Sequence, residues 1–123
     1  MQRLLIGAIV TSLVSIPGCA RPDERTEGRV PFVGCLSDGQ LGTQPAPKPR
    51  NTPVLASSVA RQLAFYAASD GPGVLAPRGW HCFGVYGSNG SGLLVTPEEL
   101  DPGKFIMQPE FRTKGYAVEL RYD

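Results

Sequence analysis

The side chains best suited to catalysis lie in one short stretch, where His81 and Cys82 are adjacent and Ser88 and Ser91 follow. His81 is the only histidine of the chain. In a Cys–His nucleophile pair, the imidazole must take the proton of the thiol. If residues 80–86 form a strand, neighbouring side chains point to opposite faces, so His81 cannot deprotonate Cys82. The sequence therefore argues against a thiol enzyme.

A serine hydrolase would have to use Ser88 or Ser91 as its nucleophile and His81 as its base. The two serines flank Asn89-Gly90, a strong hairpin signal, and the chain has no G-x-S-x-G nucleophile elbow. We therefore interpret both serines as turn residues. A small envelope hydrolase or cell-wall enzyme with a Ser/His site remains the alternative.

The sequence predicts neither a cofactor nor a metal site. The glycine-rich segment 87–92 lacks the Gly-Lys-Ser/Thr ending of a phosphate-binding loop. Glu98, Glu99 and Asp101 are clustered, but their spacing does not match a calcium-binding EF-hand loop. A solvated acidic turn explains them better.

Aromatic and polar residues of the same stretch form a candidate ligand surface. Its members are Trp80, His81, Tyr86, Ser88 and Asn89. Alternation along a strand places Trp80 and Tyr86 on one face and His81 on the other, and one of these faces must be core. The other face could present aromatic edges to a carbohydrate or a peptide.

The surrounding elements must position these residues. Residues 54–69 have helical spacing, with Leu55, Val59 and Tyr66 on one face, and Thr52-Pro53 before them is typical of a helix start. Strands are expected at residues 30–35, 79–87, 93–96, 105–107 and 116–122. The predicted fold class is α+β, with one helix packed on a small antiparallel sheet and one disulfide.

The N-terminus indicates export. Arg3 precedes an apolar run, residues 4–16, that is shorter than the roughly 20 residues of a spanning helix and typical of a secretory signal peptide. The next residues, Ile16-Pro17-Gly18-Cys19, resemble the lipobox of bacterial lipoproteins. The resemblance implies that Cys19 is diacylated, becomes the new N-terminus and attaches the protein to a membrane. Ordinary signal-peptidase cleavage after Ala20, which would give a secreted or free periplasmic protein, is the alternative.

The three cysteines support export. With Cys19 lipidated or removed, Cys35 and Cys82 remain, and two thiols in an oxidising compartment normally pair. A Cys35–Cys82 disulfide is therefore predicted. On the chain-entropy model it contributes about 4 kcal/mol to the free energy of unfolding.

These predictions divide the chain into a signal peptide (1–18), a lipidated Cys19 with a tether (19–29) and a single α+β domain (30–123). Ala20 is not the aspartate associated with inner-membrane retention of some bacterial lipoproteins, which favours the outer membrane. The full chain has 12 basic and 11 acidic residues, so loss of Arg3 leaves it neutral. A neutral chain offers no basic surface for nucleic acid.

The motifs Gly34-Cys35, 77–82 (PRGWHC) and 86–91 (YGSNGS) resemble those of a group of short exported bacterial proteins. That resemblance carries no activity and implies only that these segments form the central structure of the domain. The favoured function is a non-enzymatic binding or interaction module of the cell envelope, with an unknown envelope partner or small ligand. A periplasmic enzyme inhibitor, whose exposed loop Pro72–Arg78 plugs an enzyme, is a further alternative.

Overall fold

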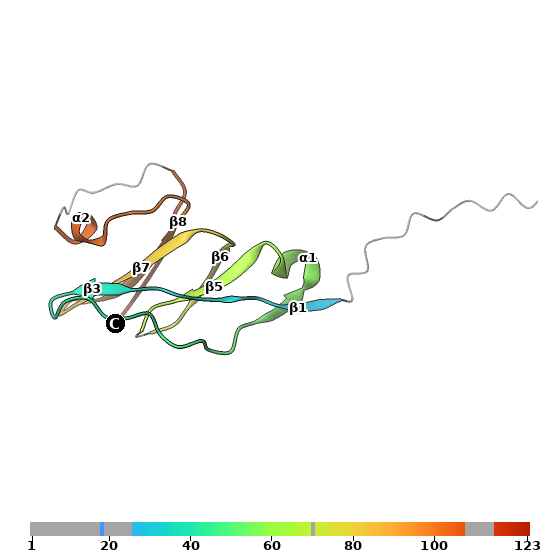
Figure 1. The fold of residues 1–123 in the computed structure, drawn as a ribbon, viewed down its shortest axis with the longest axis horizontal. Helices are drawn as coiled ribbons and strands as arrows, with labels where there is room; N and C mark the ends of the chain where they lie inside the picture. Colours follow the sequence, from blue (N-terminus) through green and yellow to red (C-terminus); the bar gives the residue numbers. More distant parts are fainter. Residues whose placement is uncertain (1–17, 19–25, 70, 108–114) are drawn as a thin grey trace, which may run out of the picture.

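The computed structural model describes residues 18, 26–69, 71–107 and 115–123, so the predicted signal peptide and Cys19 lie outside the described residues. The elements, in chain order, are β1 (Glu27–Arg29), β2 (Phe32–Gly34), β3 (Ser37–Gly39), β4 (Val54–Ala56), α1 (Ser57–Ala60), β5 (Leu63–Ala67), β6 (Val74–Pro77), β7 (His81–Gly87), β8 (Gly90–Thr96), α2 (Pro102–Met107) and β9 (Val118–Tyr122). The domain is elongated, with β1 and α1 at one end and α2 at the other (Figure 1).

The strands form three sheets, ordered β1-β4, β2-β5-β6 and β3-β7-β8-β9. The two larger sheets share one core, in which Tyr66 of β5 and Ala76 of β6 cluster with Leu93 and Val95 of β8. The predicted α+β class is correct only in outline, because the described residues are mostly β with two short helices. The two larger sheets are also mixed rather than antiparallel, since β2–β5 and β3–β7 are parallel pairs.

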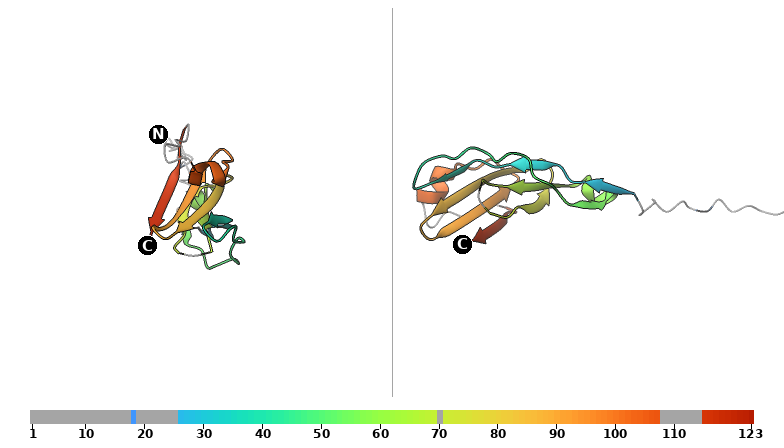
Figure 2. Two further views of the ribbon diagram at one scale, coloured as in Figure 1. Left: turned by 90° about the vertical axis from the view of Figure 1, so that its left-hand side faces the viewer. Right: turned by 90° about the horizontal axis from the view of Figure 1, so that it is seen from below.

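One nearly continuous extended segment, residues 27–39, supplies a strand to each sheet. β1 pairs with β4, β2 with β5 and β3 with β7. Main-chain hydrogen bonds continue where the segment passes between sheets: Cys35 N–H donates to Ala67 O (2.9 Å) and Gly84 N–H donates to Leu36 O (2.7 Å). The segment runs along one side of the domain (Figure 2, right). Its first strand, residues 27–29, belongs to the segment that the sequence predicted as a tether.

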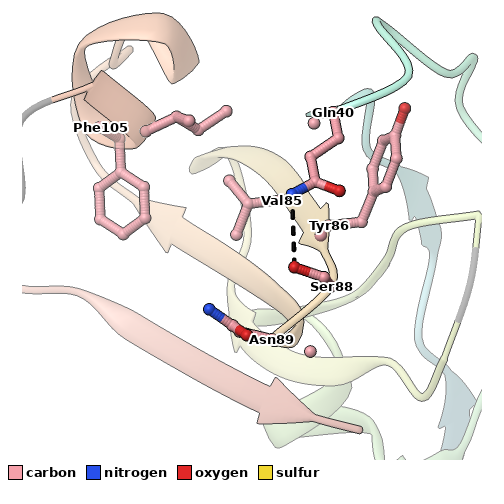
Figure 3. Close-up of a pocket in the computed structure, with 10 residues that line it drawn as sticks. Gln40, Val85, Tyr86, Ser88, Asn89 and Phe105 are labelled. Atoms are coloured by element: carbon pink, nitrogen blue, oxygen red, sulfur yellow. Dashed lines mark hydrogen bonds between the residues drawn. The ribbon is translucent and has the colours of Figure 1, made fainter.

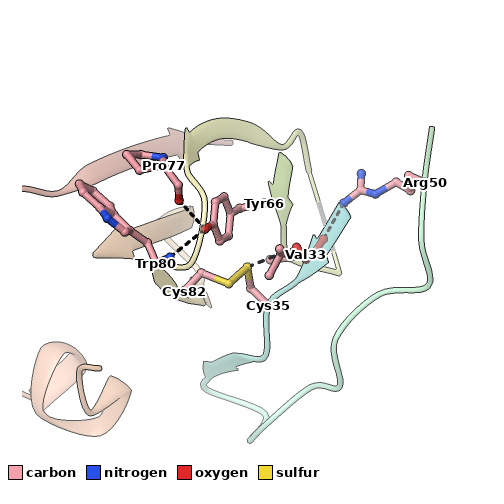
Figure 4. Close-up of a disulfide and its surroundings, with 8 residues drawn as sticks. Val33, Cys35, Arg50, Tyr66, Pro77, Trp80 and Cys82 are labelled. Atoms are coloured by element: carbon pink, nitrogen blue, oxygen red, sulfur yellow. Dashed lines mark hydrogen bonds between the residues drawn. A yellow bond between two sulfur atoms is a disulfide. The ribbon is translucent and has the colours of Figure 1, made fainter. Parts of the chain in front are cut away.

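The predicted Cys35–Cys82 disulfide is confirmed, with Cα atoms 5.5 Å apart. Cys35 lies between β2 and β3 and is only 1% exposed, while Cys82 is the second residue of β7. The bridge therefore joins the extended segment to the largest sheet at the point where the segment changes sheets (Figure 4).

The helix predicted over residues 54–69 is wrong. This stretch forms β4, the single turn of α1 and then β5, which lies between β2 and β6 in its sheet. Val59, expected on the buried face, is 45% exposed. The Thr52 hydroxyl does not cap a helix but donates to Val30 O. Pairing of β5 on both edges satisfies the hydrogen-bonding groups of its main chain. The stability gained from these two strand pairings outweighs the helical spacing of its apolar residues.

The strand predicted at residues 105–107 is also wrong, because these residues end α2. Its start carries a recognisable signal that the strand prediction ignored. Pro102 is the first helical residue, and Asp101 Oδ1 accepts a hydrogen bond from Gly103 N–H (2.9 Å) as an N-cap does.

The loop Pro72–Arg78, expected to plug an enzyme, is not a free loop. Most of it is β6, paired antiparallel with β5, and Ala76 is 2% exposed. The Arg78 side chain turns back to the domain and donates to Ala60 O (2.7 Å). This geometry does not provide the protruding loop that the inhibitor interpretation needs.

Tyr66 holds the connection between β6 and β7 through its hydroxyl. The side chain is 0% exposed, its hydroxyl donates to Pro77 O (2.7 Å), and Trp80 N–H donates to it (3.1 Å) (Figure 4). Burial raises the pKa of Tyr66 above its usual value, and the hydrogen bond from Trp80 offsets part of that shift. The connection between β6 and β7 is therefore fixed by one neutral phenol.

We predict that Tyr66→Phe lowers the free energy of unfolding by about 1–3 kcal/mol at neutral pH, since it leaves the partly buried Trp80 N–H and Pro77 C=O without their partner. The contribution of the phenol is fully present below pH 10, where the unfolded tyrosine is protonated. It is lost as the pH rises through the raised folded pKa, so the difference between wild type and variant shrinks above pH 10.

Urea denaturation followed by Trp80 fluorescence, at pH 7 and at alkaline pH, measures this difference. Tyr116→Phe is the matched control, because Tyr116 is 82% exposed. Equal effects of the two substitutions at pH 7 would contradict the role given to Tyr66.

Candidate functional site

The β7–β8 hairpin forms the base of the candidate site. The two strands pair from His81↔Thr96 to Gly87↔Gly90, and Ser88 and Asn89 form the turn. Gly90 takes the positive φ, +107°, that follows the turn, a conformation that glycine adopts without strain. The hairpin predicted from Asn89-Gly90 is thus confirmed, although β8 begins three residues before the predicted strand at 93–96.

A cleft of about 350 Å³ lies at the tip of this hairpin, between the end of β3 and α2 (Figure 3). Its lining residues are Gly39, Gln40, Val85, Tyr86, Gly87, Ser88, Asn89, Gly90, Phe105 and Ile106. The elements that meet there place it at the end of the domain opposite β1 (Figure 1). This cleft is the candidate functional site.

The cleft has an apolar side and a polar side. Phe105 and Ile106 come from α2, and the side chain of Val85 points from β7 toward Phe105 (Figure 3). Gln40 and Ser88 face each other on the polar side, where Gln40 Nε2 donates to Ser88 Oγ over a long 3.4 Å. Both residues are exposed, so a ligand can replace this weak hydrogen bond.

The apolar side is held in place by aromatic packing. The rings of Phe105 and Phe83 are 5.6 Å apart and nearly perpendicular (70°), the edge-to-face geometry that aromatic pairs favour. Phe83 is 5% exposed, so it is buried although it lies on the face opposite the disulfide. Around Phe83, both faces of β7 are therefore covered, one by the core and the other by α2.

The polar side depends on Tyr86 and Gly39. The Tyr86 hydroxyl donates to Gly42 O and so fixes the turn that carries Gln40. Gly39 pairs with Tyr86 in the parallel β3–β7 ladder. A Cβ atom at Gly39 would lie 2.2 Å from Tyr86 O, which leaves no room for any other residue.

The structure brings together three of the five predicted surface residues. Tyr86, Ser88 and Asn89 line the cleft, but Trp80 and His81 lie at the other end of β7. Trp80 packs against the core beside the disulfide (Figure 4), and the His81 side chain is exposed. The five residues of the candidate ligand surface therefore do not share one site, because β7 spreads them along its length.

The same geometry separates the proposed serine nucleophiles from their base. An extended strand rises about 3.3 Å per residue, so the length of β7 puts roughly 20 Å between Ser88 and His81. Ser91 pairs with Tyr86 and is therefore roughly 15 Å from His81. General base catalysis needs a separation of about 3 Å, so the structure does not assemble a Ser/His site from these residues.

In the acidic cluster, the Asp101 side chain and the Glu98 main chain have structural roles. Asp101 accepts the hydrogen bond at the start of α2, and the Glu98 carbonyl oxygen accepts one from the Thr96 hydroxyl (2.6 Å). Within the described ranges, no three His, Cys, Asp or Glu side chains lie close enough together to hold a metal ion.

Sequence reasoning missed Gln40, Phe105 and Ile106. Gln40 is distant in sequence from the hairpin, and no local pattern connects the two. The helix-start signal at Asp101-Pro102 would have indicated that Phe105 belongs to a helix, but not which surface that helix covers.

Comparison with known proteins adds no relative from which a function could be transferred. No protein-family model, no curated protein and no solved structure matches the chain. Among the described residues, no helix is long and apolar enough to cross a membrane. The site must therefore be interpreted from its own chemistry.

We predict that Gly39→Ala destabilises the protein and disorganises the cleft. The added Cβ would meet the Tyr86 carbonyl oxygen, and overpacking of this kind costs about 1–3 kcal/mol. Gly87→Ala is the matched control on the same cleft, because its Cβ would meet nothing closer than 3.9 Å. Urea denaturation of both variants tests this, and an equal loss of stability in both would refute the steric argument.

Proposed function

We propose that this chain is an exported, lipid-anchored cell-envelope protein whose single domain binds a ligand or partner at the cleft without catalysing a reaction. The observation that carries this proposal is the chemistry of the cleft. Its ten described lining residues include amides, a hydroxyl, a phenol and apolar groups, but no carboxylate, imidazole, amine or guanidinium. Such a lining can bind an uncharged molecule, whereas general acid–base catalysis most often uses a histidine, a carboxylate or a lysine. The one phenol of the lining, Tyr86, donates its hydroxyl hydrogen to Gly42 O.

Export is supported by two observations. The apolar run and Cys19 have the pattern of a lipoprotein signal peptide. The Cys35–Cys82 disulfide suits an oxidising compartment outside the cytosol. An outer-membrane location remains the favoured interpretation of Ala20.

The shape of the domain fits membrane attachment at its N-terminal end. β1, the first described strand, lies at the end of the domain opposite α2 and the cleft (Figure 1). A protein attached through Cys19 would therefore hold its cleft on the side away from the attachment point. This arrangement suits a module that binds a molecule in the space beyond its membrane.

Lipidation of Cys19 is the first test. Intact-mass analysis of the membrane fraction should show a diacylglyceryl group on a chain that begins at Cys19, and Cys19→Ala should prevent that modification or release the protein. Cys35→Ala/Cys82→Ala is the control, since loss of the disulfide should leave the acylation unchanged. A soluble, unmodified product that begins at Arg21 would contradict the anchor.

A second test separates binding from catalysis. We predict that His81→Gln leaves the cellular phenotype of the protein within a few-fold of wild type, because His81 is exposed and distant from the cleft. The fold of the variant is checked by circular dichroism. A folded His81→Gln protein that loses a hydrolytic activity by about 100-fold or more, the scale of general acid–base catalysis, would favour the Ser/His hydrolase instead.

A further inference from the structure

The cleft combines three uncharged polar side chains with an apolar wall. Gln40 and Asn89 each carry an amide, and Ser88 carries a hydroxyl, so each can donate and accept a hydrogen bond. Phe105 and Val85 form the opposite wall (Figure 3). A ligand that matches this cleft has one apolar face and, along its edge, groups that donate and accept hydrogen bonds.

The main chain around the cleft disfavours an extended peptide as that ligand. A peptide that binds by strand addition needs a free strand edge. β7 and β8 are each paired on both sides. β3 is the edge strand at the cleft, and its outer side already bonds to its own chain: Ser37 exchanges main-chain hydrogen bonds with Gln44, and Gly39 O accepts one from Gly42 N–H. Recognition at the hairpin tip must therefore come mainly from side chains and turn amides.

The charges near the cleft disfavour an anionic ligand. None of the described lining residues carries a positive charge. The Asp123 carboxylate lies beside the lining residue Gly90, where a Cβ atom would be 3.0 Å from Asp123 Oδ1. A negatively charged ligand would lose hydration without gaining a cationic partner.

From these observations, and resting on the proposed binding function, we propose that the cleft binds one sugar ring of a neutral saccharide. The C–H face of the ring packs on Phe105 and Val85, while its hydroxyl or N-acetyl groups bond to Gln40, Ser88 and Asn89. A volume of about 350 Å³ is at the lower end of the roughly 300–1,000 Å³ typical of small-molecule sites, which suits a ring rather than a folded partner.

The full-length chain, processed by a bacterial host and purified in detergent, is titrated with the tetramer of N-acetylglucosamine and, separately, with tetragalacturonate. Two-dimensional NMR should show shifts of the side-chain amide signals of Gln40 and Asn89 with the neutral tetramer. Tetragalacturonate, which is anionic, should bind at least tenfold more weakly.

Substitutions locate the site. Gln40→Ala and Asn89→Ala should each weaken binding of the neutral tetramer about three- to tenfold, the loss expected for one neutral hydrogen bond. Gln62→Ala is the matched control: Gln62 is also exposed, and its side-chain amide donates to Ser58 O (3.1 Å), away from the cleft. Unchanged thermal midpoints show that the variants are folded.

Two results would overturn the saccharide assignment: no binding of the neutral tetramer at millimolar concentration, or binding that Gln40→Ala and Asn89→Ala leave unchanged. Neither result would contradict the lipid anchor or the non-catalytic function, which the Cys19 and His81 experiments test independently. Conversely, tetramer that is bound at the cleft but recovered in cleaved form would overturn the non-catalytic function while supporting the site.

Discussion

The fold depends on one extended segment, residues 27–39, that contributes a strand to every sheet and is covalently fixed where it changes sheets. Without it, the β1–β4 ribbon and the two larger sheets would lose three strand pairings at once. Cys35 sits at the change from the β5 partner to the β7 partner. Its disulfide to Cys82 lowers the conformational entropy of the unfolded chain. In the folded protein the bridge adds a covalent link at the point where main-chain hydrogen bonds join the segment to two sheets.

Such a bridge matters because the core is small. Three of the seven buried residues in the main core cluster are alanines, Ala64, Ala68 and Ala76, which bury little apolar area each. Small residues also let the layers approach closely: a Cβ atom at Gly84 would lie 2.8 Å from the Cβ of Ala68. Tyr66 supplies the largest fully buried side chain, and its hydroxyl also satisfies the main chain between β6 and β7.

The cleft follows from the same arrangement. Because β3 is the last strand of the extended segment, the turn that carries Gln40 must end beside the tip of the β7–β8 hairpin. α2 then covers the outer face of β7, where Phe105 packs on Phe83. The core fixes the floor of the site, while exposed side chains whose loss would cost little stability supply its polar groups. The proposed ligand would thus pack on a well-buried floor and form hydrogen bonds with exposed side chains around it.

The sequence by itself determined the features that local chemistry controls. Pairing of Cys35 with Cys82 followed from counting thiols, and the β7–β8 hairpin, whose turn is Ser88-Asn89, followed from the Asn89-Gly90 signal. The strand expected at residues 116–122 also forms, as β9 with alternating burial, although it begins only at Val118 and leaves Tyr116 82% exposed.

Only the tertiary structure decided the rest. Residues 63–67 fit a helix by spacing, but β2 and β6 on either side made them a strand, and no local pattern reports such partners. The parallel pairings, which join segments distant in sequence, were equally invisible. The cleft draws Gln40, Asn89 and Phe105 from three separate parts of the chain. The set of side chains that line the cleft depends on which distant strands pair. That pairing is set by long-range packing, which the local residue order does not encode.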